Sequence, residues 1–161
     1  MSRRKPQFVV QQHAATSLHY DFRLEIGGAM ASWAVPKGPS TDPADKRLAM
    51  RVEDHPMSWN DFEGVIPSGY GAGAVIVWDR GMFRNDGDTS LEDGLAGGHL
   101  RVWLEGEKLR GGWSLRRMKG QQKESWLLMK RRDEEADPEG DPVVDRPESV
   151  VSGKTIEELA R

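Results

Sequence analysis

The sequence predicts an all-β protein, either a barrel or a sandwich of about eight short strands. Eight runs rich in Val, Trp, Leu and Phe follow one another between residues 8 and 132, and Gly, Pro or Asp separates them. No stretch keeps a long helical period. The 18 Gly and nine Pro supply many turns, so short strands joined by tight connections are expected.

The strands are assigned in chain order from these runs. Turn sequences such as IGG, PKGPSTDP and NDGD lie between them. The predicted strands cover residues 8–13, 18–26, 31–36, 47–54, 74–80, 99–106, 108–118 and 124–132. Helix is expected only as short turns. The best candidate is TSLEDGLAG at residues 89–97, where Thr89 or Ser90 could act as the N-cap.

The charge changes sign near residue 132. Residues 1–132 carry 20 Lys and Arg against 16 Asp and Glu, whereas residues 133–161 carry three against ten. The second part also contains Pro and few large apolar residues, which is typical of flexible segments. We therefore predict one domain over residues 1–132 and an acidic, flexible linker or tail over residues 133–161. Thr155 could cap a last helical turn, for which the sequence shows no packing face.

Composition excludes several classes of protein. No stretch approaches the roughly 18 apolar residues of a membrane span, and no apolar run follows the basic start MSRRKPQF to make a signal peptide. Without cysteine, the chain has neither disulfides nor thiolate metal sites, which fits the reducing cytoplasm. We expect a cytoplasmic protein with no membrane partner. Any metal ion must use His, Asp or Glu as ligands.

The predicted strand LHYDFRLEI, residues 18–26, has an unusual polar face. Residues two apart in a strand share a face. One face therefore carries Leu18, Tyr20, Phe22, Leu24 and Ile26, and the other carries His19, Asp21, Arg23 and Glu25. The polar face can be read as an ordinary solvated strand surface. It can also be read as a site, because His13 lies just before it.

His13, His19 and Asp21 form a possible metal-ligand set. Two imidazoles and a carboxylate suit Mn²⁺, Zn²⁺ or a similar divalent ion. His19 and Asp21 are one pleat apart on the same face, and His13 would approach from the neighbouring strand end. Arg23, next on that face, would place a guanidinium beside the ion, where it could bind a phosphate. The spacing alone is only moderately specific.

The stretch RLAMRVEDH, residues 47–55, repeats the alternation. We assign Leu48, Met50 and Val52 to its apolar face, and Arg47, Arg51, Glu53 and His55 to its polar face. His55 precedes Pro56, so a turn could direct the imidazole into a cleft, although a lone histidine is more often structural. Lys37 lies in the rigid turn VPKGP. The fourth histidine, His99, has no charged cluster nearby in the sequence, and we assign it no chemical role.

Two further features suit packing better than chemistry. The glycine-rich PSGYGAGAV lacks the Lys-Ser/Thr pair of a P-loop and precedes a strand. Gly69, Gly71 and Gly73 are therefore expected to form turns or close contacts. Five tryptophans lie in apolar runs and are expected in the core: Trp33, Trp78, Trp103, Trp113 and Trp126.

Several long motifs resemble those of a known family. The strings FVVQQHAATSLHYDFRLEIGG, SWAVPKGPSTDP, RLAMRVEDHP, FEGVIPSGYGAGAVIVWDRG and WLLMKRRD are similar to the 3′-phosphoesterase domain of bacterial DNA ligase D and its free-standing relatives. The resemblance is collinear over about residues 7–132. The tail segment RPESVVSGKTIEELA is similar to the connection between this domain and the ligase module.

The resemblance implies a fold and an activity. The fold would be a compact β-barrel with an open groove. The activity would be manganese-dependent processing of DNA or DNA/RNA 3′ ends, in which a terminal ribonucleoside and then the 3′-phosphate are removed to leave a 3′-hydroxyl. Possible partners are the ligase, polymerase or Ku of bacterial end joining. We expect a monomer.

The resemblance also assigns residues. His13, His19 and Asp21 match the metal ligands, and Arg23, Lys37, Arg47 and His55 match the phosphate-binding and catalytic positions. One position departs from the family, since Trp59 stands where a Tyr is usual. Tyr offers a hydroxyl and Trp only an indole N–H, so the alternative function is a weak or inactive module that binds DNA ends.

Overall fold

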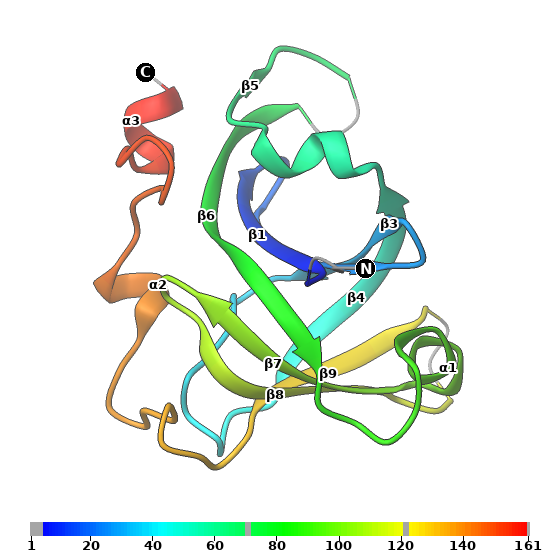
Figure 1. The fold of residues 1–161 in the computed structure, drawn as a ribbon. Helices are drawn as coiled ribbons and strands as arrows, with labels where there is room; N and C mark the ends of the chain where they lie inside the picture. The colour runs from blue at the N-terminus through cyan, green and yellow to red at the C-terminus, as the bar shows by residue number, and fades with distance from the viewer. Residues whose placement is uncertain (1–4, 70–71, 121–122, 161) are drawn as a thin grey trace.

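The computed structural model describes residues 5–69, 72–120 and 123–160, and strands dominate it (Figure 1). The described residues form nine strands and four short helical segments. The strands are β1 (Gln7–Ala14), β2 (Leu18–Ile26), β3 (Ala29–Val35), β4 (Arg47–His55), β5 (Gly64–Ile66), β6 (Gly73–Asn85), β7 (His99–Gly106), β8 (Arg110–Arg117) and β9 (Ser125–Lys130). The helical segments are η1 (Met57–Asp61), α1 (Leu91–Gly97), α2 (Pro142–Asp145) and α3 (Ile156–Ala160).

Eight strands close into an antiparallel barrel. Their order is β1-β2-β3-β4-β9-β8-β7-β6, and β6 pairs back with β1. The short β5 pairs with β6 at Gly64–Ile66 and lies outside the ring. Closure removes free strand edges. The all-β barrel prediction is confirmed, and all eight predicted strands are present. The three-residue β5 and the turn η1 are not predicted, because neither is long enough to show a period.

The barrel interior is filled by aromatic and aliphatic side chains. Phe8, Val10, Phe22 and Leu24 from the first two strands are no more than 1% exposed. Four of the five tryptophans expected in the core are fully buried: Trp33, Trp78, Trp113 and Trp126. Trp103 differs, because it lies on the outer face of β7, where the guanidinium of Arg84 is 4.8 Å from its ring centroid.

Local capping signals identify both ends of the helix α1. The Ser90 hydroxyl accepts from the backbone N–H of Asp93, as an N-cap should. Gly98 ends the helix in the left-handed conformation, with φ 85°. The predicted cap at Thr155 is also present, since its hydroxyl accepts from the backbone N–H of Glu158 at 3.3 Å.

The segment after residue 132 packs against the barrel, and here the structure differs from the sequence analysis. Ile156 in α3 is 4% exposed and belongs to a cluster with Ala74 and Ile76 of β6. Val143 packs on the main core. These apolar side chains are isolated in the sequence, so the spacing of apolar residues gives no sign that they pack against the barrel. The expectation that the last stretch lacks a packing face is therefore wrong, whereas the division of the chain at residue 132 stays a prediction.

Within the described residues, no helix has the length and apolar character needed to cross a membrane.

Gly73 supports a close contact between β6 and the end of β1. Its φ is +133°, and a Cβ there would lie 1.8 Å from the carbonyl oxygen of Ala14. Gly69 has φ +90° with open space around it, and its carbonyl accepts from the N–H of Ala72. These two glycines play the close-contact and turn roles predicted for them. Gly71 lies outside the described residues.

We expect Gly73→Ala to lower the free energy of unfolding by about 2–4 kcal/mol, because both backbone strain and a backbone clash oppose it. Gly69→Ala is the matched control. This variant introduces backbone strain but no clash, so its free energy of unfolding should fall by about 1–2 kcal/mol. Urea unfolding of both variants checks the difference. Equal losses in the two variants would contradict the close contact at Gly73.

Candidate metal and phosphate site

The polar face predicted for β2 continues across β1. The strands pair in register, with His13 opposite His19 and Gln11 opposite Asp21. Paired residues of antiparallel strands share a face. The opposite face of the same strands carries Phe8, Val10 and Phe22, which fill the barrel. The site therefore lies on the outer side of the barrel wall.

Three predicted metal ligands come together on this face. His19 Nε2 lies 3.2 Å from Asp21 Oδ1, and His13 Nδ1 lies 3.7 Å from Asp21 Oδ2. One ligand atom from each residue lies within 4.8 Å of the other two. The set offers two imidazole nitrogens and a carboxylate, which are donors that Mn²⁺ and Zn²⁺ accept. The chemistry of the donors thus fits a divalent ion.

A neighbouring contact orients His19. Its Nδ1 is 3.2 Å from the carbonyl oxygen of Ser17. If Nδ1 carries the proton, it donates to that carbonyl and leaves the lone pair of Nε2 directed toward Asp21 and the ligand set. Metal-binding histidines are commonly fixed in this way through the other ring nitrogen. The hydrogen bond with Asp21 raises the pKa of His19.

Asp21 is ionised although it is 7% exposed. Burial alone would raise its pKa, but hydrogen bonds from His13 and His19 and the charge of Arg23 outweigh burial and hold the pKa well below its ordinary value. The carboxylate is therefore available as a charged ligand at neutral pH.

Arg23 is the centre of the hydrogen-bond network. It is 3% exposed. Its Nε donates to Gln11 Oε1 at 2.9 Å and its Nη1 donates to Ser32 Oγ at 2.8 Å, while Nη2 lies 3.4 Å from Asp21 Oδ2. A buried guanidinium needs such partners to offset its lost hydration. The polar face is thus mostly buried, and the reading of it as a solvated strand surface is wrong.

A β-bulge brings His55 to the same face. In the pairing of β3 with β4, Ser32 lies opposite Val52 and Met30 lies opposite His55, with a register shift between the two pairs. The extra residue changes which side chains point to each face. His55 therefore shares the face of Val52 rather than the face of Arg51. The assignment of Arg47, Arg51 and His55 to one face is wrong for this reason.

His55 is held in one tautomer by Arg23. The Nη1 of Arg23 is 2.9 Å from His55 Nδ1, and a guanidinium can only donate. Nδ1 must then accept, so the proton lies on Nε2. The carbonyl of Glu53 is 3.0 Å from the same Nδ1 and would favour a proton there, but the permanent charge of Arg23 opposes that. Burial, followed by this charge, lowers the pKa of His55.

The segment of residues 57–66, comprising η1 and β5, covers part of the site, and we call it the cover segment (Figure 1). The buried side chain of Gln11 joins it to β1, since Nε2 donates to the carbonyls of Trp59 at 2.9 Å and Phe62 at 3.3 Å. The rings of Trp59 and Phe62 stack at 4.3 Å with an interplanar angle of 9°. The Trp59 ring centroid is 6.2 Å from that of His55.

Two residues of this network are absent from the sequence prediction. Gln11 bridges Arg23 to the cover segment, and Ser32 binds Arg23 from the neighbouring strand. Gln11 has a signal in the sequence, since it lies two residues before His13 on the same strand face. Ser32 has none, because its role depends on the pairing of β2 with β3.

The structure does not bring Lys37 and Arg47 into this network. Lys37 is exposed in the turn after β3. Arg47 shares the inward face of β4 with Ala49, and its Nη2 lies 3.8 Å from Asp45. The Nε of Arg47 is buried without a hydrogen-bond partner among the described residues. Lys37 and Arg47 could therefore fill their predicted roles only if their side chains extend to a bound substrate.

Comparison with known proteins assigns the chain to a family. The family model described as the DNA Ligase D 3′-phosphoesterase domain matches residues 11–117. The chain belongs to the family of DNA ligase D 3′-phosphoesterase domains. The matched range contains all the residues of the network described above.

Curated relatives of this chain are long end-joining proteins. The Pseudomonas aeruginosa "Multifunctional non-homologous end joining protein LigD" is 52% identical over 158 residues, covering 93% of this chain and 18% of the relative. The Mycobacterium tuberculosis LigD is 43% identical over 121 residues, with 74% and 15% covered. The Mycolicibacterium smegmatis LigD is 40% identical over 133 residues, with 80% and 17% covered. The chain thus spans less than a fifth of the length of these relatives.

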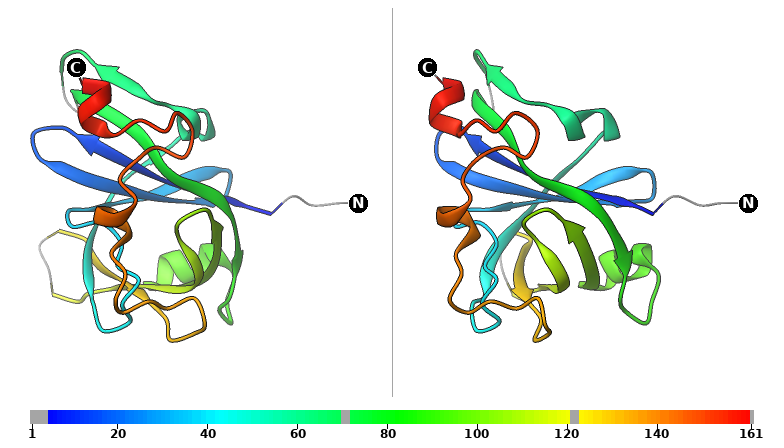
Figure 2. Two further views of the ribbon diagram at one scale, coloured as in Figure 1. Left: turned by 90° about the vertical axis from the view of Figure 1, so that its left-hand side faces the viewer. Right: turned by 60° about the vertical axis from the view of Figure 1, so that its left-hand side comes forward.

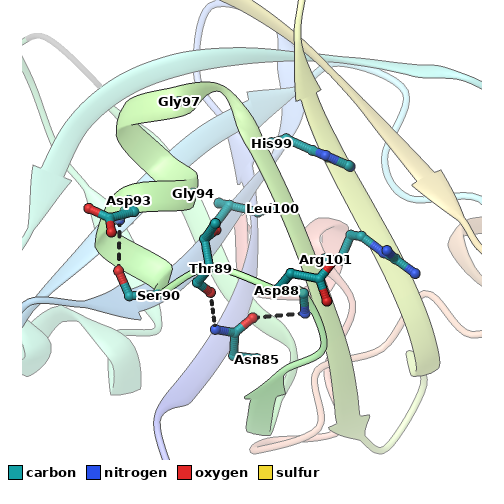
Figure 3. Close-up of a pocket in the computed structure, with 11 residues that line it drawn as sticks. Asn85, Asp88, Thr89, Ser90, Asp93, Gly94, Gly97, His99, Leu100 and Arg101 are labelled. Carbon is teal, nitrogen blue, oxygen red and sulfur yellow. Dashed lines mark hydrogen bonds between the residues drawn. The ribbon is translucent and has the colours of Figure 1, made fainter.

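A cavity lies away from the network, between α1 and β7 (Figure 3). Asn85, Ser90 and Asp93 line it together with His99 and Arg101, and none of the predicted site residues does. The open groove expected at the site stays a prediction. Arg116 lies opposite His99 in the pairing of β7 with β8, and Arg101 lies two residues further along β7, so basic residues do stand near His99. Burial and then the charges of Arg116, Arg101 and Arg131 lower the pKa of His99.

Proposed function

We propose that this phosphoesterase domain is a manganese-dependent enzyme that processes DNA 3′ ends. It would remove a 3′-terminal ribonucleoside by cleaving a phosphodiester, and then hydrolyse the 3′-phosphate to leave a 3′-hydroxyl for end joining. One observation carries the proposal: a His-His-Asp ligand set lies directly beside a buried arginine and a neutral histidine on one face of the barrel.

His13, His19 and Asp21 would hold the ion. A bound Mn²⁺ would supply Lewis-acid polarisation of a phosphate oxygen. The two histidines offer neutral nitrogen donors, and the Asp21 carboxylate brings one negative charge that Arg23 partly balances. A substrate phosphate next to these groups would find positive charge on both sides.

Arg23 and His55 would bind the phosphate. Arg23 is fixed by Gln11 and Ser32, so its guanidinium needs no reorganisation when a substrate enters. His55 would donate its Nε2–H to a phosphate oxygen, because Nδ1 is already occupied by Arg23. Lys37, from the turn after β3, and Arg47, from the first position of β4, would add positive charge toward a terminal phosphate.

A turnover assay on matched duplexes tests the proposal. The substrates end in a 3′-ribonucleotide, a 3′-phosphate or a 3′-hydroxyl, and each is incubated with and without Mn²⁺. We expect the first two to be converted to a 3′-hydroxyl end only with Mn²⁺, and the third to stay unchanged. Binding of all three without turnover would instead identify a non-catalytic module that binds DNA ends, the alternative that Trp59 in place of the usual Tyr leaves open.

The protonation of His55 gives a prediction that needs no substrate. At pH 7 we expect ¹⁵N–¹H spectra of the imidazole to show a proton on Nε2 and none on Nδ1, because Arg23 occupies Nδ1. In the folded chain its pKa is below the ordinary value of 6.5. The unfolded chain therefore binds this proton first, so the contribution of His55 to stability is complete above pH 6.5 and is lost as the pH falls.

A His55→Gln variant is the control for this dependence on pH. Its stability should fall less steeply than that of the unaltered protein as the pH decreases from 6.5. A proton found on Nδ1 at pH 7 would contradict the assigned tautomer.

A further inference from the structure

The C-terminal segment of residues 146–156, which we call the strap, runs along β6 (Figure 2). The backbone N–H of Val150 donates to the carbonyl of Val77 at 3.0 Å, and the indole N–H of Trp78 donates to the carbonyl of Arg146 at 2.9 Å. Lys108 Nζ also donates to the carbonyl of Arg146, at 2.9 Å. The strap is thus attached to the barrel wall at several points before α3 begins.

Ser149 connects the strap to the cover segment. Ser149 is 3% exposed, and its hydroxyl donates to Glu63 Oε1. The same Glu63 oxygen accepts from the backbone N–H of Val77 at 2.8 Å. Ser149 Oγ also accepts from the backbone N–H groups of Val151 and Ser152, at 2.9 and 3.0 Å. One buried hydroxyl therefore fixes the turn of the strap and the carboxylate of the cover segment together.

Apolar contacts join the same two segments. Val150 of the strap and Met57 of the cover segment both pack against a buried cluster of Val9, Met30 and Val77. The cluster lies on the strand face that carries the site, since Val9 pairs with Arg23 and Met30 pairs with His55. The strap and the cover segment thus share one small hydrophobic core beside the site.

From the cover segment the contacts continue to the site. Phe62, the residue before Glu63, accepts from Gln11 through its carbonyl, and Gln11 accepts from Arg23. Ser149 thereby lies at the end of a continuous series of contacts that reaches the buried guanidinium. His13, His19 and Asp21 stand on β1 and β2, and of these three Asp21 contacts the end of this series, through Arg23.

We propose that the strap positions the cover segment over the phosphate site, and that Ser149 and Glu63 are the positioning residues. Without the hydrogen bond between them, the strap would reach the cover segment only through the small hydrophobic core that Val150 and Met57 share. The Gln11 contacts, the hydrogen bond of Asn60 with Gln7 and the short pairing of β5 with β6 would still hold the cover segment to the barrel. Substrate contacts made by the cover segment would weaken, while metal binding would be unaffected. The kinetic part of this proposal rests on the proposed function, but the structural part does not.

Hydrogen exchange on the full chain tests the structural part. We expect amides of residues 57–66 to exchange faster in Ser149→Ala and Glu63→Ala, each of which removes one partner of the hydrogen bond, and amides of β7 and β8 to be unchanged. Ser149→Thr keeps the hydroxyl and should restore much of the protection. Ser152→Ala is the matched control, because Ser152 is exposed and its hydroxyl accepts within the strap from Lys154. Unchanged exchange of residues 57–66 in both variants, or equally faster exchange of β7 and β8, would overturn the proposal.

Mn²⁺ titration and kinetics test the kinetic part of the proposal. The affinity for Mn²⁺ should be the same in Ser149→Ala and in the unaltered protein, whereas the KM for a 3′-ribonucleotide-ended duplex should rise by about 3- to 10-fold, as expected for the loss of one hydrogen bond. A weaker Mn²⁺ affinity, or an unchanged KM in an active enzyme, would overturn the positioning role. If the unaltered protein shows no turnover, the proposed function fails and the exchange result still decides the inference.

Discussion

In His19→Ala and Asp21→Asn we expect Mn²⁺-dependent hydrolysis of a 3′-ribonucleotide-ended duplex to fall by more than about 100-fold, because even the loss of groups that only support metal ligands costs 10- to 100-fold. The two residues contribute ligand atoms on one strand face. Asp21→Asn keeps the shape of the carboxylate and removes its charge. Turnover and Mn²⁺ titration on the same samples check the prediction.

The matched control is His99→Ala, a histidine in the exposed start of β7 and outside the network. It should retain the activity of the unaltered protein. If His19→Ala and Asp21→Asn bind Mn²⁺ as tightly as the unaltered protein, the ligand assignment is wrong. If they bind it weakly but hydrolyse the duplex at the normal rate, the ion has no part in the reaction.

Arg23→Lys should be the most harmful conservative change in the site. Lysine keeps the charge but cannot donate to Gln11, Ser32 and His55 from one planar group. Because the position is 3% exposed, we expect the free energy of unfolding to fall by about 2–4 kcal/mol. We also expect kcat/KM to fall by about 100-fold or more, since the phosphate contact and the tautomer of His55 both depend on this guanidinium.

Urea unfolding, and kinetics at a temperature where the variant is fully folded, separate these two effects. Arg84→Lys is the control, because Arg84 is exposed on the outer face of the barrel. Arg84→Lys should leave both the free energy of unfolding and kcat/KM nearly unchanged. A fully stable Arg23→Lys variant would show that the network around the guanidinium does not support the barrel wall.

Much of the fold was predictable because its signals are local. In the eight strands of the barrel, polar and apolar residues alternate or the strand is a short apolar run. Ser90 and Thr155 stand at the starts of helices, where they act as N-caps. β5 was missed because three residues carry no period. The packing of the strap was missed because its apolar side chains make single contacts with elements far away in the chain.

The candidate site was predictable where periodicity applies. His19, Asp21 and Arg23 share a face because alternate residues of a regular strand must do so. Periodicity failed at β4, where the bulge moved His55 to the face opposite that of Arg47 and Arg51. A bulge is set by the pairing of two strands, so the spacing of polar residues within one strand cannot reveal it.

By itself the sequence determined the strands, the caps and which side chains of β2 stand together, since these follow from backbone geometry over a few residues. Three features follow from the folded structure alone: this polar face is buried, Gln11 and Ser32 complete it, and Ser149 contacts the cover segment. The physical reason is that burial and hydrogen bonding depend on which distant strands and segments meet. Closure of the barrel through the pairing of β1 with β6 determines which strands and segments come into contact.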